Sequence, residues 1–260
     1  VWLNNATTPS SETDSRAFSF DVLPSSLIDN MMIYKSPSAE LPADFSGGFV
    51  RVMTKNIPDG NTFNVSYQMG FNTNATFRNF QLTDGTAKDY LGFGADVRNL
   101  PSSFPAHLGE HSTDEAAAFT RQINQRWGIN KFTAIPDQKI SLTSHRSYDV
   151  GGWKIGNITN LNWSTEFDYS ETVNNNYIAY DVKNDVSRPR FEYNDIRYKN
   201  TSKLGALFNW SFQRDGSKYE LRNFFSQRGV SALTQREGMN YYSDKDIRKW
   251  ESLYTGRTTY

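Results

Sequence analysis

The sequence predicts an all-β protein with unusually long strands. Apolar and polar residues alternate along several segments, which is the pattern of strands with one apolar and one polar face. Two such segments, residues 153–171 and 194–213, run for about 20 residues, whereas strands of globular domains usually have about 3–10. Tight glycine-containing turns at 150–153 and 214–217 join strands of this kind. We therefore expect part of a transmembrane antiparallel β-barrel, with one short helix in a long loop.

Composition restricts the function classes. The chain has 260 residues, with 28 basic and 28 acidic residues, so its charge gives no reason to expect a nucleic-acid partner. With no cysteine there is no disulfide framework and no thiolate metal site. We also find no run of about 18 apolar residues, the length of a transmembrane helix. The high aromatic content, 15%, fits a barrel and also fits a secreted β-sandwich carbohydrate-binding module, which remains the alternative.

Alternation assigns the two faces of each strand. Odd positions from Phe63 to Phe71 are apolar, and even positions of the same segment, such as Asn64, are polar. Even positions from 204 to 212 are likewise apolar, with Lys203 and Asn209 on the opposite face. In a barrel the apolar faces would contact lipid and the polar faces would line the lumen. Further strands are expected at 138–150, 218–228 and 248–260.

The connections differ in length on the two sides of the predicted barrel. The tight turns would lie in the periplasm, and the long connections 84–137, 172–193 and 229–247 would lie outside the cell. This order requires residues 62–82 to be one strand with an irregularity near 72–75; a hairpin there would exchange the two sides. We favour the single strand. In the first long loop, Ser112 or Thr113 can cap a helix that has Asp114 and Glu115 in its first turn.

Residues 19–55 resemble the last part of the plug domain of TonB-dependent outer-membrane receptors. The resemblance lies in a strand ending at Lys35, a turn, a glycine pair and a strand closing on Thr-Lys, followed by the segments DYLGF (89–93) and RNLPSSFP (98–105), which are similar to the first barrel loop of one subgroup. Ser36 departs from the common pattern, as does the segment 41–46. The glycine pair would permit a positive φ or a close backbone approach, or would simply form a hairpin turn. The motif residues are Lys35, Pro37, Gly47, Gly48, Thr54 and Lys55.

The resemblance implies both the domain organisation and the function. Residues 1–58 would be the C-terminal part of a plug domain, and 59–260 the first strands, about six, of an outer-membrane barrel that has about 22 strands in such receptors. The chain would therefore be a fragment. It would take part in active uptake of siderophore iron, a glycan, cobalamin or a peptide across the outer membrane of a Gram-negative bacterium. Its partners would be a TonB-type energising complex, acting on a missing N-terminal part, outer-membrane lipid and, for some substrates, a surface lipoprotein.

No catalytic, cofactor or metal site is expected. Glu166 and Asp168 share one strand face and are interpreted as lumenal polarity, and the spacing of His107 and His111 is interpreted as that of polar loop residues. Substrate contacts in the resembled family come from plug apices and barrel loops. Aromatic residues of the first loop could stack on a sugar or siderophore ring, or could only pack the loop's own core. These candidates are Tyr90, Phe93, Phe104 and Trp127.

Overall fold

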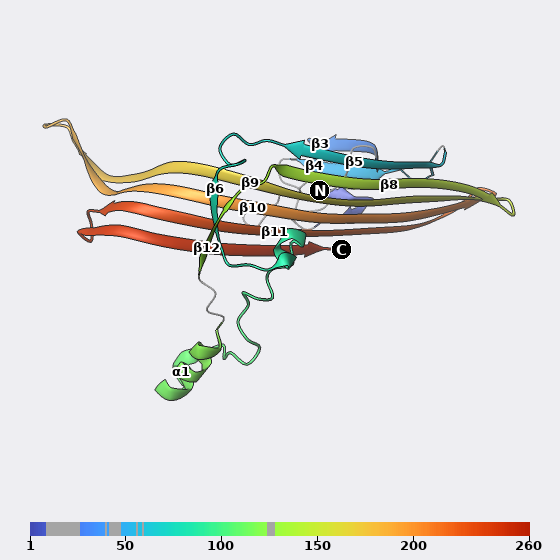
Figure 1. The fold of residues 1–260 in the computed structure, drawn as a ribbon. Helices are drawn as coiled ribbons and strands as arrows, with labels where there is room; N and C mark the ends of the chain where they lie inside the picture. The colour runs from blue at the N-terminus through green and yellow to red at the C-terminus, as the bar shows by residue number, and fades with distance from the viewer. Residues whose placement is uncertain (9–26, 40, 42–47, 56, 59, 124–127) are drawn as a thin grey trace.

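A computed structural model describes residues 1–8, 27–39, 41, 48–55, 57–58, 60–123 and 128–260. Within this part the protein is all-β, with three sheets, short 3₁₀ turns and a single α-helix. The all-β prediction is confirmed. Figure 1 shows long strands running side by side, with shorter elements packed across them.

The main sheet has six antiparallel strands in the order β12-β11-β10-β9-β8-β5. Neighbours in space are therefore neighbours along the chain, apart from the segment between β5 and β8. In the described part of the chain the sheet is open rather than closed into a barrel, with β5 and β12 at its edges. Its strands are β5 (Thr62–Gly70), β8 (Asp137–Val150), β9 (Trp153–Asp181), β10 (Val186–Arg214), β11 (Ser217–Asn240) and β12 (Lys245–Thr259).

Two of the three predicted long loops are wrong. β9 and β10 are 29 residues each, and only residues 182–185 separate them, so 172–193 is mostly a paired ribbon. In the same way β11 extends to Asn240 and β12 begins at Lys245, within the predicted loop 229–247. Apolar residues of these ribbons do not keep to alternate positions, as the adjacent Tyr177 and Ile178 show, so the sequence has no regular alternation that would mark them as strands.

The two tight turns are confirmed. Gly151 and Gly152 have φ values of 59° and 79°, and Asp215 and Gly216 have 47° and 80°. Two successive positive φ values are typical of the type I′ turn, whose twist matches that of the strands it joins.

The N-terminal unit is a small mixed sheet in the order β2-β1-β4-β3. β3 and β4 pair antiparallel with Tyr34 opposite Phe49, which confirms the two predicted strands of this segment, while β1 is parallel to β4. Of the connecting residues, 40 and 42–47 lie outside the described part. The strands are β1 (Trp2–Leu3), β2 (Ala6–Thr7), β3 (Ile28–Tyr34) and β4 (Phe49–Thr54).

Residues 62–83 form an interrupted strand. β5 pairs with β8, and β6 (Asn79–Thr83) pairs with β7 (Ile129–Thr133), so the chain runs antiparallel to the same partner segment throughout. The hairpin alternative is therefore wrong, but the strand is not continuous either. Residues 71–78 form turns, with Thr76 N–H donating to the Asn72 carbonyl at 2.8 Å. This interruption lets the β6–β7 ribbon cross the main sheet, as Figure 1 shows.

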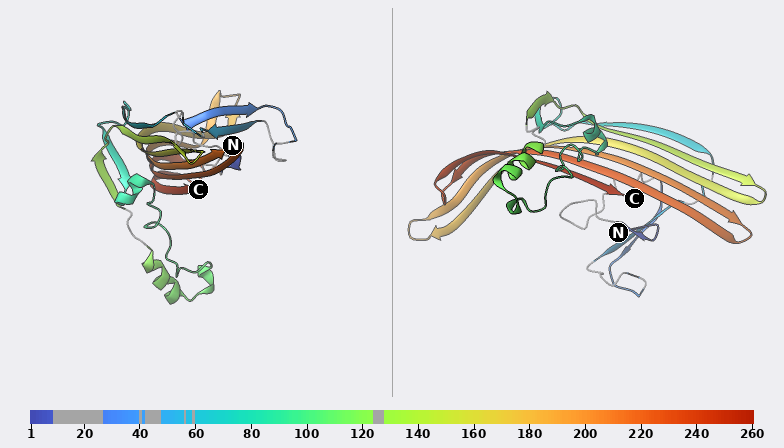
Figure 2. Two further views of the ribbon diagram at one scale, coloured as in Figure 1. Left: turned by 90° about the vertical axis from the view of Figure 1, so that its right-hand side faces the viewer. Right: turned by 90° about the horizontal axis from the view of Figure 1, so that it is seen from below.

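The main sheet is bowed and covered differently on its two faces. Figure 2 shows the N-terminal unit on the concave side and the β6–β7 ribbon on the convex side, while α1 (Thr113–Gln122) projects beyond the β12 edge of the sheet. On the concave face Leu3, Leu27 and Val52 pack on Ile158 and Leu207. On the convex face a second cluster forms beneath the β6–β7 ribbon, made of Ala75, Phe80, Ala134, Phe167 and Tyr198.

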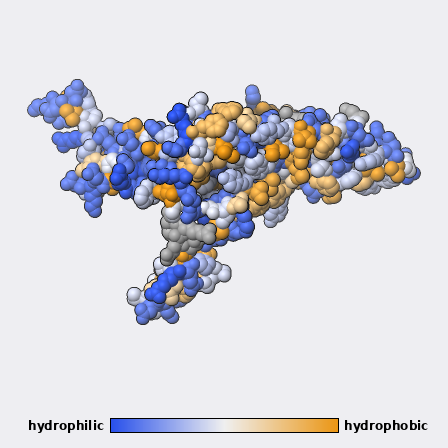
Figure 3. Space-filling view, viewed as in Figure 1, coloured by the Kyte–Doolittle hydropathy of each residue, from blue (hydrophilic) through white to orange (hydrophobic). Residues whose placement is uncertain are grey.

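Large apolar side chains remain exposed on the convex face near the tight turns. The register places the apolar positions of β5, β8, β9, β10 and β11 on this one face. Figure 3 shows apolar residues across the middle of the molecule and toward that end, with polar residues at the opposite ribbon tips and on α1. We call this surface the convex apolar band, and its exposed members include Phe63, Val65, Tyr67, Met69, Ile140, Leu142, Leu161, Phe208 and Leu221.

Candidate functional site: the contact between the N-terminal unit and the sheet

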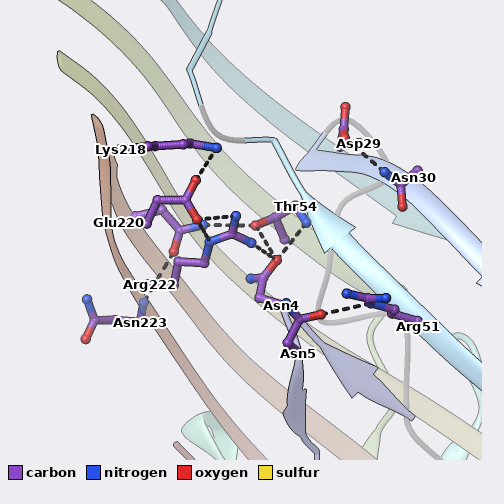
Figure 4. Close-up of polar contacts among 11 residues, drawn as sticks. Asn4, Asn5, Asp29, Asn30, Arg51, Thr54, Lys218, Glu220, Arg222 and Asn223 are labelled. Atoms are coloured by element: carbon purple, nitrogen blue, oxygen red, sulfur yellow. Dashed lines mark hydrogen bonds and ion pairs between the residues drawn. The ribbon is translucent and has the colours of Figure 1, made fainter. Parts of the chain in front are cut away.

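Thr54, a residue of the predicted plug motif, lies at the centre of a polar contact between the N-terminal unit and the concave face. Its N–H and its hydroxyl both donate to Asn4 Oδ1, at 2.9 and 3.0 Å. Its hydroxyl oxygen accepts from Asn209 Nδ2 of β10 at 3.1 Å. Thr54 is 1% exposed, so these partners take the place of water. Figure 4 shows Asn4 and Thr54 of the N-terminal unit facing each other next to the strands of the main sheet.

Arg222 of β11 joins the same network. Its Nη1 donates to Asn4 Oδ1, while its Nε and Nη2 donate to Glu220 at 3.1 and 2.7 Å (Figure 4). Lys218 adds a second cation, 2.5 Å from the Glu220 carboxylate. The network thus joins one carboxylate, two cations and the side-chain oxygen of Asn4, and charge-assisted bonds of this kind are the stronger ones in proteins.

Apolar contacts accompany the polar ones. Ile158 and Leu207 belong to the polar face of their strands and are 0% and 3% exposed. Their neighbours on that face include Asn160 and Asn209, so apolar residues occur there where Leu3, Leu27 and Val52 cover them. The concave face is therefore shaped to receive the N-terminal unit.

A charged pocket of about 270 Å³ lies on the concave face beyond the N-terminal unit. Lys199 lies 3.0 Å from Asp168, and Lys203 lies 3.6 Å from Glu166. Both carboxylates thus have a lysine partner, which agrees with a polar surface and gives no support to a catalytic pair. Arg228 lines the same pocket. The arrangement can bind polar groups of either charge.

Of the predicted loop aromatics that the structure describes, Tyr90 and Phe93 lie against the main sheet and Phe104 lies against α1. Phe93 stacks on Phe225 of β11, with centroids 6.4 Å apart, and the Tyr90 carbonyl accepts from Trp163 Nε1 at 2.6 Å, both on the convex face. Phe104 packs instead against Phe119 of α1 at 6.3 Å, within the loop's own core. Trp127 lies outside the described residues.

The remaining motif residues have modest roles in the structure. Lys35 and Pro37 are exposed, and Lys55 N–H donates to the Leu27 carbonyl at 2.9 Å. A Cβ at Gly48 would meet nothing within 4 Å, so the described residues show no close backbone approach at this position. Gly47 lies outside the described residues.

The histidine segment of the first loop belongs to a helix cap. Ser112, one of the two caps that the sequence offered, is the N-cap of α1, and Glu115 completes a capping box that was not predicted from the sequence. His111 Nδ1 lies 3.7 Å from the Glu115 carboxylate, and its ring packs on Phe119. In the described ranges no three His, Asp or Glu side chains gather as a metal site would require.

Sequence reasoning missed Asn4, Arg222 and Glu220. Arg222 and Glu220 alternate with the apolar Tyr219 and Leu221 close to a tight turn, which marks a charged patch on one face of the strand. Their partner Asn4 is 218 positions from Arg222, and no local pattern could have paired them.

Comparison with protein-family models, with curated proteins and with solved structures finds no match. Among the helices that the structure describes, none is long and apolar enough to cross a membrane.

Proposed function

We propose that this chain is part of a TonB-dependent transporter of the bacterial outer membrane. In this proposal the N-terminal unit is the last part of the plug, and the six-stranded sheet is part of the barrel wall. The chain makes and breaks no covalent bond of its substrate.

The observation that carries the proposal is the inverted polarity of the main sheet. In a soluble β-sandwich the apolar face is buried and the polar face meets water. Here the face that packs the N-terminal unit carries buried polar residues, among them Asn160, Asn209 and Ser211, while large apolar side chains are exposed on the other face. A barrel wall with a polar lumen and a lipid-facing exterior has this distribution.

The length of the apolar segment of β10 also supports a barrel wall that crosses a membrane. β10 places Leu204, Ala206, Phe208, Trp210 and Phe212 on the convex face in strict alternation. This segment spans nine residues, and a transmembrane strand needs about 9–11. The much longer strands then extend beyond the bilayer, as the barrels of large transporters do.

The contact at Thr54 gives the plug a defined resting position. In the proposed mechanism an energised inner-membrane complex pulls on a more N-terminal part of the plug, and the bonds of Asn4 to Thr54 and Arg222 would have to yield. The charged pocket on the same concave face favours a substrate with polar groups, bound from outside above the plug.

Cysteine labelling on intact cells tests the proposal. The sequence contains no cysteine, so single cysteines can be placed at Ser112, at Asn184 and at Ser217. A membrane-impermeant thiol reagent should label the first two, in the loop and at a ribbon tip, but should label Ser217→Cys only after the outer membrane is opened. Equal labelling at all three sites, or recovery of the protein outside the outer-membrane fraction, would contradict the proposal.

A further inference from the structure

A cleft of about 620 Å³ opens on the convex face, and no residue of the N-terminal unit lines it. It lies where the interrupted segment 71–78 and the start of β6 meet β9 and β10. Its volume is in the range of cavities that hold small ligands, about 300–1,000 Å³. The function proposed above makes no use of it.

The chemistry of the lining suits a sugar ring. The rings of Phe77 and Tyr169 supply flat apolar surfaces, and the largely buried Tyr198 forms part of the cleft wall. Asn79 supplies a carboxamide that can both donate and accept hydrogen bonds. Pyranose rings present C–H groups on one side and hydroxyl groups around the edge, and this mixture complements both kinds of surface.

The charges in the cleft argue against an anion as the main ligand group. Arg78 is the cation of the lining and Glu171 is the anion, so the two formal charges offset each other. Glu171 also accepts a hydrogen bond from the Tyr169 hydroxyl. A neutral hydroxylated ring therefore fits the cleft better than a phosphate does.

Phe77 is held in the cleft wall by an unfavourable backbone conformation. Its φ is +60°, which is rare for a bulky side chain, and the ring is 68% exposed. Hydrogen bonds from Phe77 N–H to the Ala134 carbonyl at 2.9 Å and from Arg78 Nε to the Thr73 carbonyl at 2.9 Å fix this turn. Backbone strain that displays an exposed aromatic ring is a feature that clusters at ligand sites.

The cleft continues directly from the convex apolar band. Phe71, 66% exposed, follows Met69 of the band, and its ring lies 6.3 Å from that of Phe77. Asn72 Nδ2 donates to the Phe167 carbonyl at 3.2 Å, and Tyr169 and Glu171 are the next convex positions along β9. At about 3.3 Å of rise per residue, the cleft begins only a few residues beyond the end of the band. Exposed aromatic rings at that level are typical of a membrane–water interface.

We propose that this cleft binds a sugar ring in the headgroup of an outer-leaflet glycolipid, with the acyl chains lying along the convex apolar band. The inference rests on the proposed function, because the band must face lipid. A free oligosaccharide shares the ring chemistry, but the continuity of the cleft with the band favours the lipid-linked sugar.

The test uses the full chain in a detergent without sugar groups, with native mass spectrometry to count bound molecules. Three probes are compared: a lipopolysaccharide with a short sugar core, a phosphatidylglycerol without sugar, and the core oligosaccharide released from its lipid. The variant is Phe77→Gly, which removes the ring and suits the positive φ. Phe63→Gly is the matched control, because Phe63 is 64% exposed on the same face but lies at the far end of the band.

We expect Phe77→Gly to weaken lipopolysaccharide binding about fivefold, the change that about 1 kcal/mol produces at 25 °C. Phe63→Gly should leave the preference for lipopolysaccharide over phosphatidylglycerol unchanged. The inference is overturned if both lipids bind equally, if the free oligosaccharide binds as well as the glycolipid, or if Phe77→Gly has no effect. Those results would not contradict the proposed function, because binding of either lipid still indicates that the convex apolar band faces lipid. If neither lipid binds, both the glycolipid site and the proposed function are contradicted.

Discussion

The Thr54 hydroxyl connects two elements that are distant in sequence. It donates to Asn4 within the N-terminal unit and accepts from Asn209 of the main sheet. Because Thr54 is 1% exposed, water cannot easily replace either partner. An unsatisfied buried polar group costs about 1–3 kcal/mol, so this one oxygen matters for the position of the whole unit.

Thr54→Val should therefore loosen the N-terminal unit without changing the shape of the side chain. We expect the docked state to lose about 1–3 kcal/mol, because Asn209 Nδ2 loses its acceptor. Hydrogen exchange followed by mass spectrometry should show faster exchange in β4 and unchanged exchange in the middle of β9. Thr62→Val, at an exposed position of β5, is the control. Equal effects of the two substitutions would mean that the Thr54 contact contributes little.

The environment of Phe208 distinguishes lipid from water. Phe208 is 45% exposed within the convex apolar band, so in a soluble protein an arginine there would be tolerated. If the band faces lipid near the bilayer midplane, Phe208→Arg should cost ~2–4 kcal/mol. Folding measured by denaturant titration in vesicles checks the value. Tyr180→Arg, at a position 57% exposed near a ribbon tip, should cost far less. A similar small cost for both would argue against lipid at Phe208.

At the scale of elements, the tight turns and the N-terminal strands make different demands on glycine. Gly216 has φ +80° and a Cβ there would meet nothing, so Gly216→Ala is opposed by the backbone alone. We expect it to destabilise the β10–β11 hairpin by about 1 kcal/mol. Gly48→Ala, where a Cβ would meet nothing within 4 Å, should cost less stability than Gly216→Ala. Thermal unfolding of the two variants checks this prediction. A larger loss of stability in Gly48→Ala than in Gly216→Ala would refute it.

The capping box of α1 makes this helix sensitive to acid. Hydrogen bonds from the Ser112 backbone and hydroxyl hold the pKa of Glu115 below its ordinary value of 4.5. A lowered pKa in the folded helix means that the stabilisation is present above pH 4.5 and is lost as the pH falls through the folded value. NMR of the α1 amides should show fraying below that pH, and Glu115→Gln should remove the pH dependence. If α1 of Glu115→Gln still frays at low pH as the unchanged protein does, another titrating group causes the fraying.

Elements marked by a local sequence pattern could be predicted, and elements held only by contacts distant in sequence could not. Alternation located the strand cores, paired positive-φ residues located the turns, and Ser112 with Glu115 located the helix, because each signal is local. The paired ribbons at 172–193 and 229–247 were not predicted. Backbone hydrogen bonds hold them together, and polar residues such as Asn174 and Asn240 interrupt any apolar alternation there. The contact of Asn4 with Arg222 escaped because the fold alone brings these residues together.

At the scale of the whole molecule, the convex face changes character along the strands. Trp210 of β10 lies opposite Asn157 and Leu221, within the convex apolar band. Trp250 of β12 is on the same face and 64% exposed, but it lies opposite Gln235, which pairs with Ile196. Along β10 the two rows are separated by positions 196 to 210, about 45 Å at the usual rise per residue. Trp210 and Trp250 thus lie on one face at very different heights.

This separation predicts how each tryptophan responds to lipid. With strands tilted by about 40°, an apolar band about 25 Å tall can include the row of Trp210 but not that of Trp250. In vesicles of lipids brominated on the acyl chains, the protein's tryptophan fluorescence should be quenched. Trp210→Phe should remove part of that quenching, because it removes an emitter in contact with the chains, whereas Trp250→Phe should raise the quenched fraction by removing an emitter in water. Lipids brominated on the headgroup serve as the control and should reverse the order. If Trp210→Phe leaves acyl-chain quenching unchanged, the convex apolar band does not face lipid. Its exposed apolar side chains would then be better explained as a surface that binds another protein.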